Sequence, residues 1–323
     1  MRRGVRSVAV LGSIALVVAA LAAAFLYQRY EAAGPLTEPV TLVVPKGASV
    51  AQIAGLLAGA RVLTLPWLFR VAVRLESADG SLRAGEYRFE PGESMRDVLA
   101  RLREGDVVMH RITVPEGMSS VQVVALLREA EGLGGDIVAP PVEGSLLPET
   151  YTYVLGDTRN DLLRRMATAM TAVLDEAWAA REPGLPLASP RDAVILASIV
   201  ERETALPRER PRVAAVFLNR LRLGMKLQAD PTVAYALYGG EPAERPLNLA
   251  DLQYPSAYNT YVIDGLPAGP IANPGRASLD AVLRPMRSED LYFVADGTGG
   301  HAFARTLDEH QRNVARWRKR NDN

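Results

Sequence analysis

The sequence predicts an α+β protein in three parts: one N-terminal membrane-spanning helix, a smaller α/β region and a larger α+β domain with a helical core. Three observations predict it. The chain opens with a basic stub and an uncharged apolar run, short strand–turn–helix patterns follow, and longer apolar helices dominate the rest. We therefore divide the chain into a stub over residues 1–6, a span over 7–30, and two regions over 31–140 and 141–323.

The N-terminal segment has the pattern of a membrane anchor. Arg2, Arg3 and Arg6 precede an uncharged, mostly apolar run over residues 7–27, which is long enough for one span. Because basic residues stay on the cytoplasmic side, we expect a cytoplasmic stub and a chain that otherwise lies outside the cytoplasm. A cleaved signal peptide is the alternative, since the alanines at 22–24 resemble a cleavage site. We favour the anchor because the apolar run continues past these alanines.

Composition excludes several kinds of site. The sequence has no cysteine, so disulfides and thiolate chemistry are excluded. Lys and Arg together number 37, as do Asp and Glu, and no basic stretch marks a nucleic-acid footprint, so no nucleic-acid partner is expected. His110, His301 and His310 are poorly spaced for a metal site, and we interpret them as structural or surface residues. No metal and no cofactor are expected.

Residues 31–140 contain an internal repeat. The segment TLVVPKGAS at 41–49 matches RITVPEGMS at 111–119, and each combines a β-branched strand, a Pro-x-Gly turn and a Ser-led helix. A weaker third copy begins at residue 87. The helices of the three copies are expected over residues 49–57, 95–103 and 119–130. This order looks like the small glycan-binding LysM module, and a packing or spacer role is the alternative.

The region 141–323 follows a proline-rich junction and begins with amphipathic helices. The expected elements are helices over 159–181, 190–204 and 209–223, a hairpin of 291–295 with 301–305, and a terminal helix over 307–318. Residues 227–274 have little periodicity and are rich in amides, hydroxyls and aromatic rings. Such loops suit sugars, which offer hydroxyls to bind and apolar faces to stack upon; ordinary turn chemistry is the alternative.

The most informative segment is SPRDAVILASIVERET at 189–204. Ser189 suits an N-cap and Pro190 the first helical position, and the middle of the helix is apolar on all sides, which is typical of a core helix. Two carboxylates, Glu201 and Glu203, nevertheless stand at its far end. At about 100° per residue, Glu203 falls inside the apolar arc and Glu201 at its edge.

A carboxyl group on a buried apolar face has a raised pKa, because burial disfavours the charged form. A raised pKa is what a general acid needs near neutral pH. The alternative is that one of the two carboxylates pairs with a nearby arginine while the other is exposed.

Several motifs keep a specific order and spacing along the chain. They are EGxxxPxTY at 143–151, IVExET at 199–204, FxNRL at 217–221, LQxDPTVxY at 227–235, YNTY at 258–261, LPxGPI at 266–271 and HxF at 301–303. Together they resemble the YceG-like family of membrane-anchored endolytic murein transglycosylases, and the resemblance covers essentially the whole chain.

The resemblance implies an enzyme, a lytic transglycosylase that cleaves MurNAc-β-1,4-GlcNAc bonds within nascent peptidoglycan and leaves 1,6-anhydroMurNAc ends, which terminates strand elongation. It also implies peptidoglycan synthases, the penicillin-binding proteins, as partners, and a single-pass protein of the inner membrane whose catalytic domain, 141–323, is periplasmic. A hydrolytic muramidase and a non-catalytic glycan-binding scaffold are the alternatives.

The reaction needs one well-placed carboxyl group. It protonates the departing sugar oxygen, the C6 hydroxyl of the same sugar closes the ring, and the carboxylate then takes the hydroxyl proton. Lytic transglycosylases commonly carry this acid in a Glu-Ser or Glu-Thr pair near a helix end, so we choose Glu203, followed by Thr204, and keep Glu201 as the alternative. The residues hypothesised to line the glycan cleft or shape its edge are Gln228, Asp230, Tyr235, Tyr258, Asn259, Tyr261, Glu143 and Tyr151.

Overall fold

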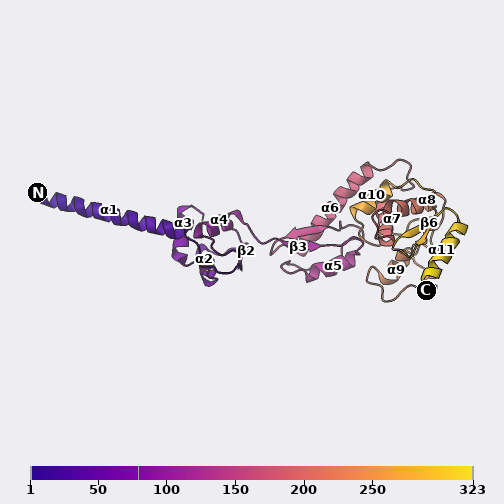
Figure 1. Ribbon diagram of the computed structural model, residues 1–323, viewed down its shortest axis with the longest axis horizontal. Helices are drawn as coiled ribbons and strands as arrows, with labels where there is room; N and C mark the ends of the chain where they lie inside the picture. The colour runs from indigo at the N-terminus through magenta and orange to yellow at the C-terminus, as the bar shows by residue number, and fades with distance from the viewer. Residues whose placement is uncertain (1, 79, 322–323) are drawn as a thin grey trace. The chain divides into compact units, whose positions relative to one another are not determined.

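The computed structural model describes residues 2–78 and 80–321, which form two compact units (Figure 1). One unit holds the residues up to His110 with the short segment Val154–Gly156, and the other holds Arg111–Tyr153 with the residues from Asp157 on. Met1 of the predicted stub and residues 322–323 of the predicted domain lie outside the described residues. The fold is of the mixed α+β kind, as predicted.

The chain begins with the long helix α1, Arg2–Glu31. Its segment Val10–Glu31 is long and apolar enough to cross a bilayer, a test that a membrane anchor and an N-terminal signal sequence both pass. The helix runs without a break through residues 22–24. Near its end, Leu26 and Tyr30 pack against the core of the first unit, and Tyr30 Oη donates to Glu76 Oε1 at 2.6 Å.

The first unit is built on one antiparallel strand pair and three short helices. Strand β1, Val40–Val44, pairs with β2, Gly85–Phe89. The helices are α2, Val50–Gly59, α3, Pro66–Leu75, and α4, Met95–Glu104. Strands and helices enclose a core around Phe69, Tyr87 and Phe89. Helix α3 lies between the predicted elements and was not expected.

The predicted repeat is present in the backbone. Gly47, Gly92 and Gly117 occupy equivalent turns with φ of 78°, 82° and 80°, a left-handed conformation that favours glycine. Two residues after each glycine, a serine caps a helix through a capping box. The three predicted helices are therefore confirmed, with bounds that shift by a few residues.

From Arg111 on, the second copy of the repeat belongs to the second unit. Strand β3, His110–Thr113, precedes α5, Ser120–Glu129, and pairs with β4, Thr150–Tyr153. The turn between β3 and α5 is also held from afar, since Gly117 N–H donates to Asn273 O at 3.0 Å. The compact units thus divide at 110/111, whereas the sequence placed a junction at 140/141, because β3 pairs with a strand beyond that junction.

The remaining elements follow in the second unit. They are α6, Arg159–Ala179, α7, Pro190–Glu203, α8, Arg210–Arg222, α9, Asp230–Tyr238, the 3-10 turn η1, Asp251–Gln253, α10, Arg276–Leu283, the hairpin of β5, Tyr292–Ala295, with β6, His301–Ala304, and α11, Leu307–Asn321. The predicted helices and hairpin are confirmed; α9 and α10 were not expected.

Helix α7 is the central helix of this unit, as its apolar sequence predicts. Every residue from Ala193 to Val200 is buried, and the helix packs against α6, α8, α9 and α10 (Figure 1). Ser189 caps its first turn and Pro190 occupies the first position. The helix ends at Glu203, so both carboxylates of its last turn stand where the core meets the surrounding loops.

Candidate active site

Glu201 is a buried carboxylate with both oxygens engaged. Arg210 Nη2 donates to its Oε1 at 2.7 Å, and Gly275 N–H donates to its Oε2 at 2.9 Å. The same nitrogen of Arg210 donates to Glu116 Oε2 at 2.8 Å. Burial raises the pKa of Glu201, while the Gly275 N–H and the Arg210 charge act in the opposite sense. Glu201 therefore ties α7 to α8 and to the start of α10.

Glu203 stands in a different environment. No hydrogen bond to its carboxyl group is found among residues 2–78 and 80–321, and the residue is partly exposed. Desolvation and, next, the negative charge of Asp230 raise its pKa to about 8, against the lowering effect of Arg220. At neutral pH this carboxyl group therefore carries a proton that no acceptor among the described residues binds.

The order of burial differs from the helical-wheel prediction. The wheel placed Glu203 deeper than Glu201, but the Glu201 side chain is only 3% exposed and Glu203 is at the rim. The exposed surface reverses the predicted order because α8 and the start of α10 cover the Glu201 side, while α7 ends at Glu203. Desolvation is nevertheless the main cause of the raised pKa of Glu203, as its place in the apolar arc predicts. The alternative was that one carboxylate pairs with an arginine while the other is exposed. Glu201 does pair with Arg210, whereas Glu203 is only partly exposed and its pKa is raised.

Arg220 fixes the loop that follows α8. Its guanidinium donates to the carbonyl oxygens of Lys226 at 3.1 Å, Leu227 at 2.8 Å and Leu291 at 2.7 Å. The next residue, Gln228, has φ of 52°, which is uncommon for a residue with a Cβ. Arg220 thus holds the predicted site residue Gln228 in a strained backbone conformation beside the start of α9.

Asp230 and Tyr261 come together, although they lie in separate motifs. Tyr261 Oη donates to Asp230 Oδ1 at 2.6 Å, and Asp230 is the exposed first residue of α9. Burial and the Asp230 charge raise the pKa of Tyr261, so its hydroxyl stays protonated as a donor. The structure thus places this pair near Glu203: the Asp230 charge raises the pKa of Glu203, and the Glu203 charge helps to raise the pKa of Tyr261.

Tyr235, Tyr258 and Glu143 form a second group. The two rings lie with centroids 4.9 Å apart and tilted by 46°, and Tyr235 Oη donates to Glu143 Oε2 at 3.3 Å. Glu143 Oε1 accepts from Ser120 N–H at 2.8 Å and from Asn273 Nδ2 at 3.3 Å. Burial raises the pKa of Glu143. Both rings are partly exposed, so they present an aromatic surface held by a carboxylate beneath it.

Two predicted site residues lie inside the fold instead. Asn259 is fully buried, and its Nδ2 donates to the carbonyl oxygens of Leu252 at 3.1 Å and Tyr254 at 2.8 Å. Tyr151 is buried in a core cluster, and its Oη donates to Leu147 O at 2.8 Å. Their contacts hold a loop and a core, respectively, and neither presents its polar group at a surface.

Sequence reasoning missed the buried polar residues that assemble the site. Asn273 joins the turn before α5 to the segment before β4, because its Oδ1 accepts from Leu146 N–H at 3.0 Å and its Nδ2 donates to Met118 O at 3.0 Å. Arg210 and Arg220 are likewise buried. The two arginines stand on either side of the buried apolar middle of α8, residues 213–218, and that position was the available signal.

The three histidines have local partners. His110 Nε2 lies 2.6 Å from Glu86 Oε2, and His301 Nδ1 lies 2.7 Å from Glu209 Oε2. The His310 ring stacks on Tyr292, with centroids 5.2 Å apart. Within residues 2–78 and 80–321, no three side chains of His, Asp or Glu come together as a metal site would require.

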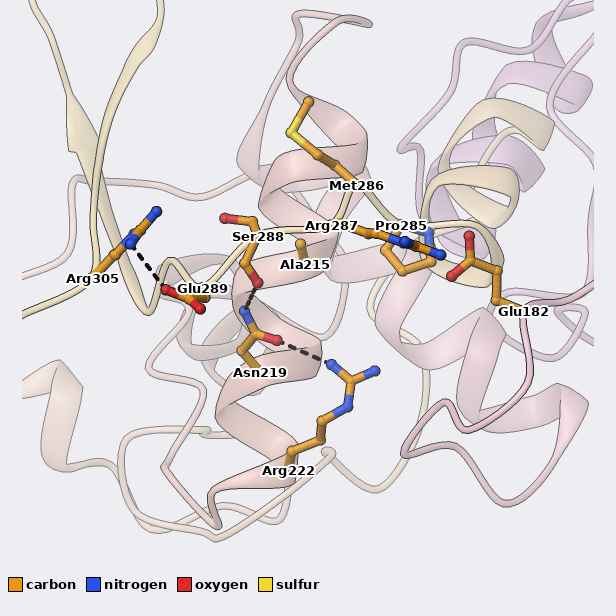
Figure 2. A pocket seen from close by; sticks show the side chains of 10 residues that line it. All are labelled: Glu182, Ala215, Asn219, Arg222, Pro285, Met286, Arg287, Ser288, Glu289 and Arg305. Carbon is orange, nitrogen blue, oxygen red and sulfur yellow. Dashed lines mark hydrogen bonds and ion pairs between the residues drawn. The ribbon is translucent and has the colours of Figure 1, made fainter.

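A separate hollow of about 460 Å³ lies beside α8 and contains none of the predicted site residues (Figure 2). Asn219 Nδ2 donates to Ser288 O at 2.8 Å, and Arg222 Nη1 donates to Asn219 Oδ1 at 3.0 Å. On one side, Arg305 pairs with Glu289 at 2.9 Å. Asn219, from the FxNRL motif, thus fixes the segment before β5 rather than the surroundings of Glu203.

Comparison with known proteins identifies the family. The sequence model of the YceG-like family matches residues 42–316. The chain belongs to the YceG-like family. The predicted family is therefore confirmed, and the match includes both compact units.

Named relatives of this YceG-like chain are enzymes. The endolytic murein transglycosylase of Bacillus subtilis is 30% identical over 329 residues, covering 90% of this chain and 88% of the relative. The endolytic murein transglycosylase of Streptococcus pneumoniae serotype 2 is 26% identical, covering 85% of this chain and 58% of the relative. The crystal structure of a YceG-like protein from Listeria monocytogenes matches with a TM-score of 0.52 and 28% identity, covering 85% of this chain and 99% of that one.

Proposed function

We propose that this YceG-like chain is an endolytic lytic transglycosylase that cleaves MurNAc-β-1,4-GlcNAc bonds within nascent peptidoglycan. One observation carries the proposal: Glu203 offers a proton from a carboxyl group whose pKa is about 8, at the partly exposed end of a core helix. Its setting is a chain whose relatives are named endolytic murein transglycosylases. Cleavage inside a growing strand would terminate its elongation.

Glu203 supplies both proton transfers. The neutral carboxyl group donates its proton to the glycosidic oxygen as the C1–O bond of MurNAc breaks. The C6 hydroxyl oxygen of the same MurNAc then bonds to C1 of the oxocarbenium-like centre, and its proton passes to the Glu203 carboxylate. The carboxyl group is regenerated, no water is consumed, and the product end is 1,6-anhydroMurNAc.

Glu201 acts as a positioning residue in this proposal. Its two oxygens accept from Arg210 and Gly275, so neither faces a glycosidic oxygen. By joining α7 to α8 and α10, it fixes the direction of the last helical turn, on which Glu203 stands. A buried charge with its partners in place has little reason to exchange protons during the reaction.

The glycan is proposed to lie along the exposed polar and aromatic groups around Glu203. The partly exposed rings of Tyr235 and Tyr258 suit the apolar faces of sugars. Asp230 and Gln228 are exposed and suit sugar hydroxyls. Glu143 supports Tyr235 from below through the hydrogen bond to its hydroxyl.

We further propose that α1 is an uncleaved anchor in the cytoplasmic membrane and that the two units are extracytoplasmic, where peptidoglycan synthases are available as partners. The support is that α1 continues through residues 22–24 and ends against the core of the first unit. A LysM-like, glycan-binding role of the repeat around residues 41–57 remains part of this proposal.

Mass analysis of digested glycan strands tests the reaction. Purified full-length chain is incubated with uncrosslinked strands, and the released ends are measured. A transglycosylase leaves ends that are lighter by one water than hydrolysed ends. Reducing ends alone would make the chain a muramidase, and no cleavage of any strand by the native chain would favour a scaffold.

A further inference from the structure

Helix α3 in the first unit carries apolar side chains on its exposed face. Trp67, Val71 and Leu75 follow one another at a spacing of one helical turn and are 49%, 42% and 80% exposed. The opposite face, with Leu68, Phe69, Ala72 and Val73, is buried in the core of the unit. An outward stripe of large apolar residues on a helix that already fills a core requires an explanation beyond folding.

Two arginines flank this stripe. Arg70 and Arg74 are exposed neighbours on the same helix, one turn apart. Among the residues that the structure describes, neither guanidinium group has a hydrogen bond or an ion pair. Apolar residues with tryptophan on one side and basic residues on the other are typical of a helix that lies in a membrane interface.

An apolar hollow connects α3 with the end of α1. Its volume is about 390 Å³. It is lined by Ala23, Leu26, Tyr27 and Tyr30 of α1 and by Leu68, Val71, Ala72, Leu75 and Glu76 of the α3 segment. The single charged residue of this lining is satisfied, since Glu76 accepts from Tyr30 and from Arg103. The remaining lining is suited to a hydrocarbon chain.

The shared hollow fixes the depth of α3 relative to α1. Ala23 lies within the apolar run of α1, and Tyr27 and Tyr30 stand where aromatic residues mark a membrane interface. Val71 and Leu75 line the same hollow as these residues. If α1 spans the bilayer, the exposed stripe of α3 therefore lies at the level of the outer headgroups and the first carbons of the acyl chains.

We infer that α3 is a second membrane contact and that the hollow between α1 and α3 holds an acyl chain of an outer-leaflet phospholipid. Arg70 and Arg74 bind its phosphate or that of a neighbouring lipid. The inference rests on the proposed anchoring by α1. This second contact adds to the anchor because it holds the first unit against the membrane surface. A single span alone would leave the unit free to rotate about the axis of α1.

Depth-dependent fluorescence quenching in vesicles tests this inference. The sequence contains three tryptophans, so Trp178→Phe with Trp317→Phe leaves Trp67 alone in the full-length chain. The chain is reconstituted into phosphatidylcholine–phosphatidylglycerol vesicles with bromine on the upper acyl carbons. We expect the Trp67 emission to fall about twofold or more relative to unbrominated vesicles, because an interfacial ring lies near those carbons.

A matched variant gives the control. Trp67→Phe with Trp317→Phe leaves Trp178, whose ring packs against the core of the second unit, and its emission should not change with bromination. Arg70→Gln with Arg74→Gln should weaken the quenching of Trp67 more in phosphatidylglycerol-rich vesicles than in phosphatidylcholine vesicles, because the lost positive charges attract the anionic lipid. Val71→Ser with Leu75→Ser, both at exposed positions, should reduce it in either lipid.

Flotation and strand cleavage, measured on the same vesicles, separate the possible failures. Chain that floats and cleaves strands but shows no quenching of Trp67 overturns the inference and indicates that a protein covers α3, while the proposed function stands. Quenching that is unchanged by Val71→Ser with Leu75→Ser overturns the acyl-chain site. Chain that does not float refutes the anchor and the inference together, and cleavage then reports on the enzyme alone.

Discussion

Glu201 and Glu203 stand two residues apart at the end of α7, yet only one of their carboxyl groups has protein partners. The Glu201 carboxylate accepts from Arg210 and from Gly275 N–H, while the Glu203 carboxyl group has no hydrogen bond in the described part of the chain. The pKa of both groups is raised by burial. Because only Glu201 is hydrogen-bonded, Glu201 stabilises the fold and Glu203 is available to transfer a proton.

Replacing Glu203 by Gln should abolish strand cleavage while leaving the fold intact. The amide keeps the size of the side chain but has no acidic proton to give, so the rate should fall about 10²- to 10⁴-fold or more. Release of anhydro-ended fragments, followed by mass analysis, measures the effect. Because no partner of Glu203 is lost, the variant should unfold at no lower temperature than the native chain. Cleavage at the native rate would remove Glu203 as the acid.

Replacing Glu201 by Gln should instead cost stability. The change removes the charge opposite Arg210, a buried guanidinium, and leaves it with only Glu116. We expect a loss of about 2 kcal/mol in the free energy of unfolding. Thermal unfolding measures this, with Glu289→Gln, in an exposed pair, as a control expected to change stability by less than about 0.5 kcal/mol. An inactive but fully stable Glu201→Gln chain would exchange the roles of the two glutamates.

Cleavage should decline as the pH rises through about 8, because the proton that Glu203 donates is lost there. Asp230→Asn removes the negative charge that helps to raise this pKa, so the alkaline limb of the rate profile should move to lower pH. The control is Asp264→Asn, which removes an exposed charge from the same loop region. Identical limbs in the native and Asp230→Asn chains would show that Glu203 does not set the profile.

Removing one aromatic ring should weaken glycan binding more than chemistry. Tyr258→Ala takes away half of the ring pair with Tyr235 and should raise KM about tenfold with a smaller change in kcat, since stacking on sugars is made before the reaction. Tyr254→Ala is a suitable control because that ring is exposed in the preceding segment. A pure kcat effect would indicate that Tyr258 positions Glu203 instead of substrate.

Local patterns predicted most of the elements but not their assembly. Capping serines and apolar periodicity located α2, α4, α5, α7 and α8, because both signals are short-range. Helix α9 escaped because Asp230 opens it inside a stretch with little periodicity. Helix α3 was also missed, although its buried face, with Leu68, Phe69, Ala72 and Val73, and its exposed Arg70 and Arg74 follow the helical period.

The site shows the same limit. Sequence pointed to both glutamates and to the Asp230 and Tyr261 motifs, because unusual residue types in an apolar helix or a loop are visible one by one. It did not show that Asn259 faces inward, nor that Glu201 pairs with Arg210, since both depend on contacts across the fold. The wheel ranked burial from α7 alone and could not include the elements that cover Glu201.

The raised pKa of Glu203 also predicts how stability changes with pH. Its ordinary value is 4.5 and its value in the fold is about 8, so between these limits the unfolded chain loses a proton that the folded chain keeps. Stability due to this group should therefore be intact below pH 4.5 and fall as the pH rises towards 8, by up to about 1.4 kcal/mol per pH unit. Glu203→Gln does not titrate and escapes this loss.

Glu203→Gln should thus unfold near the temperature of the native chain at pH 4.5 and at a clearly higher temperature than the native chain at pH 8. Melting curves of both chains across this range measure the difference. Glu244→Gln, at an exposed position, should follow the native chain throughout. Parallel curves for the native and Glu203→Gln chains would mean that Glu203 is ionised in the fold at neutral pH, and a carboxylate ionised at that pH could not serve as the proton donor.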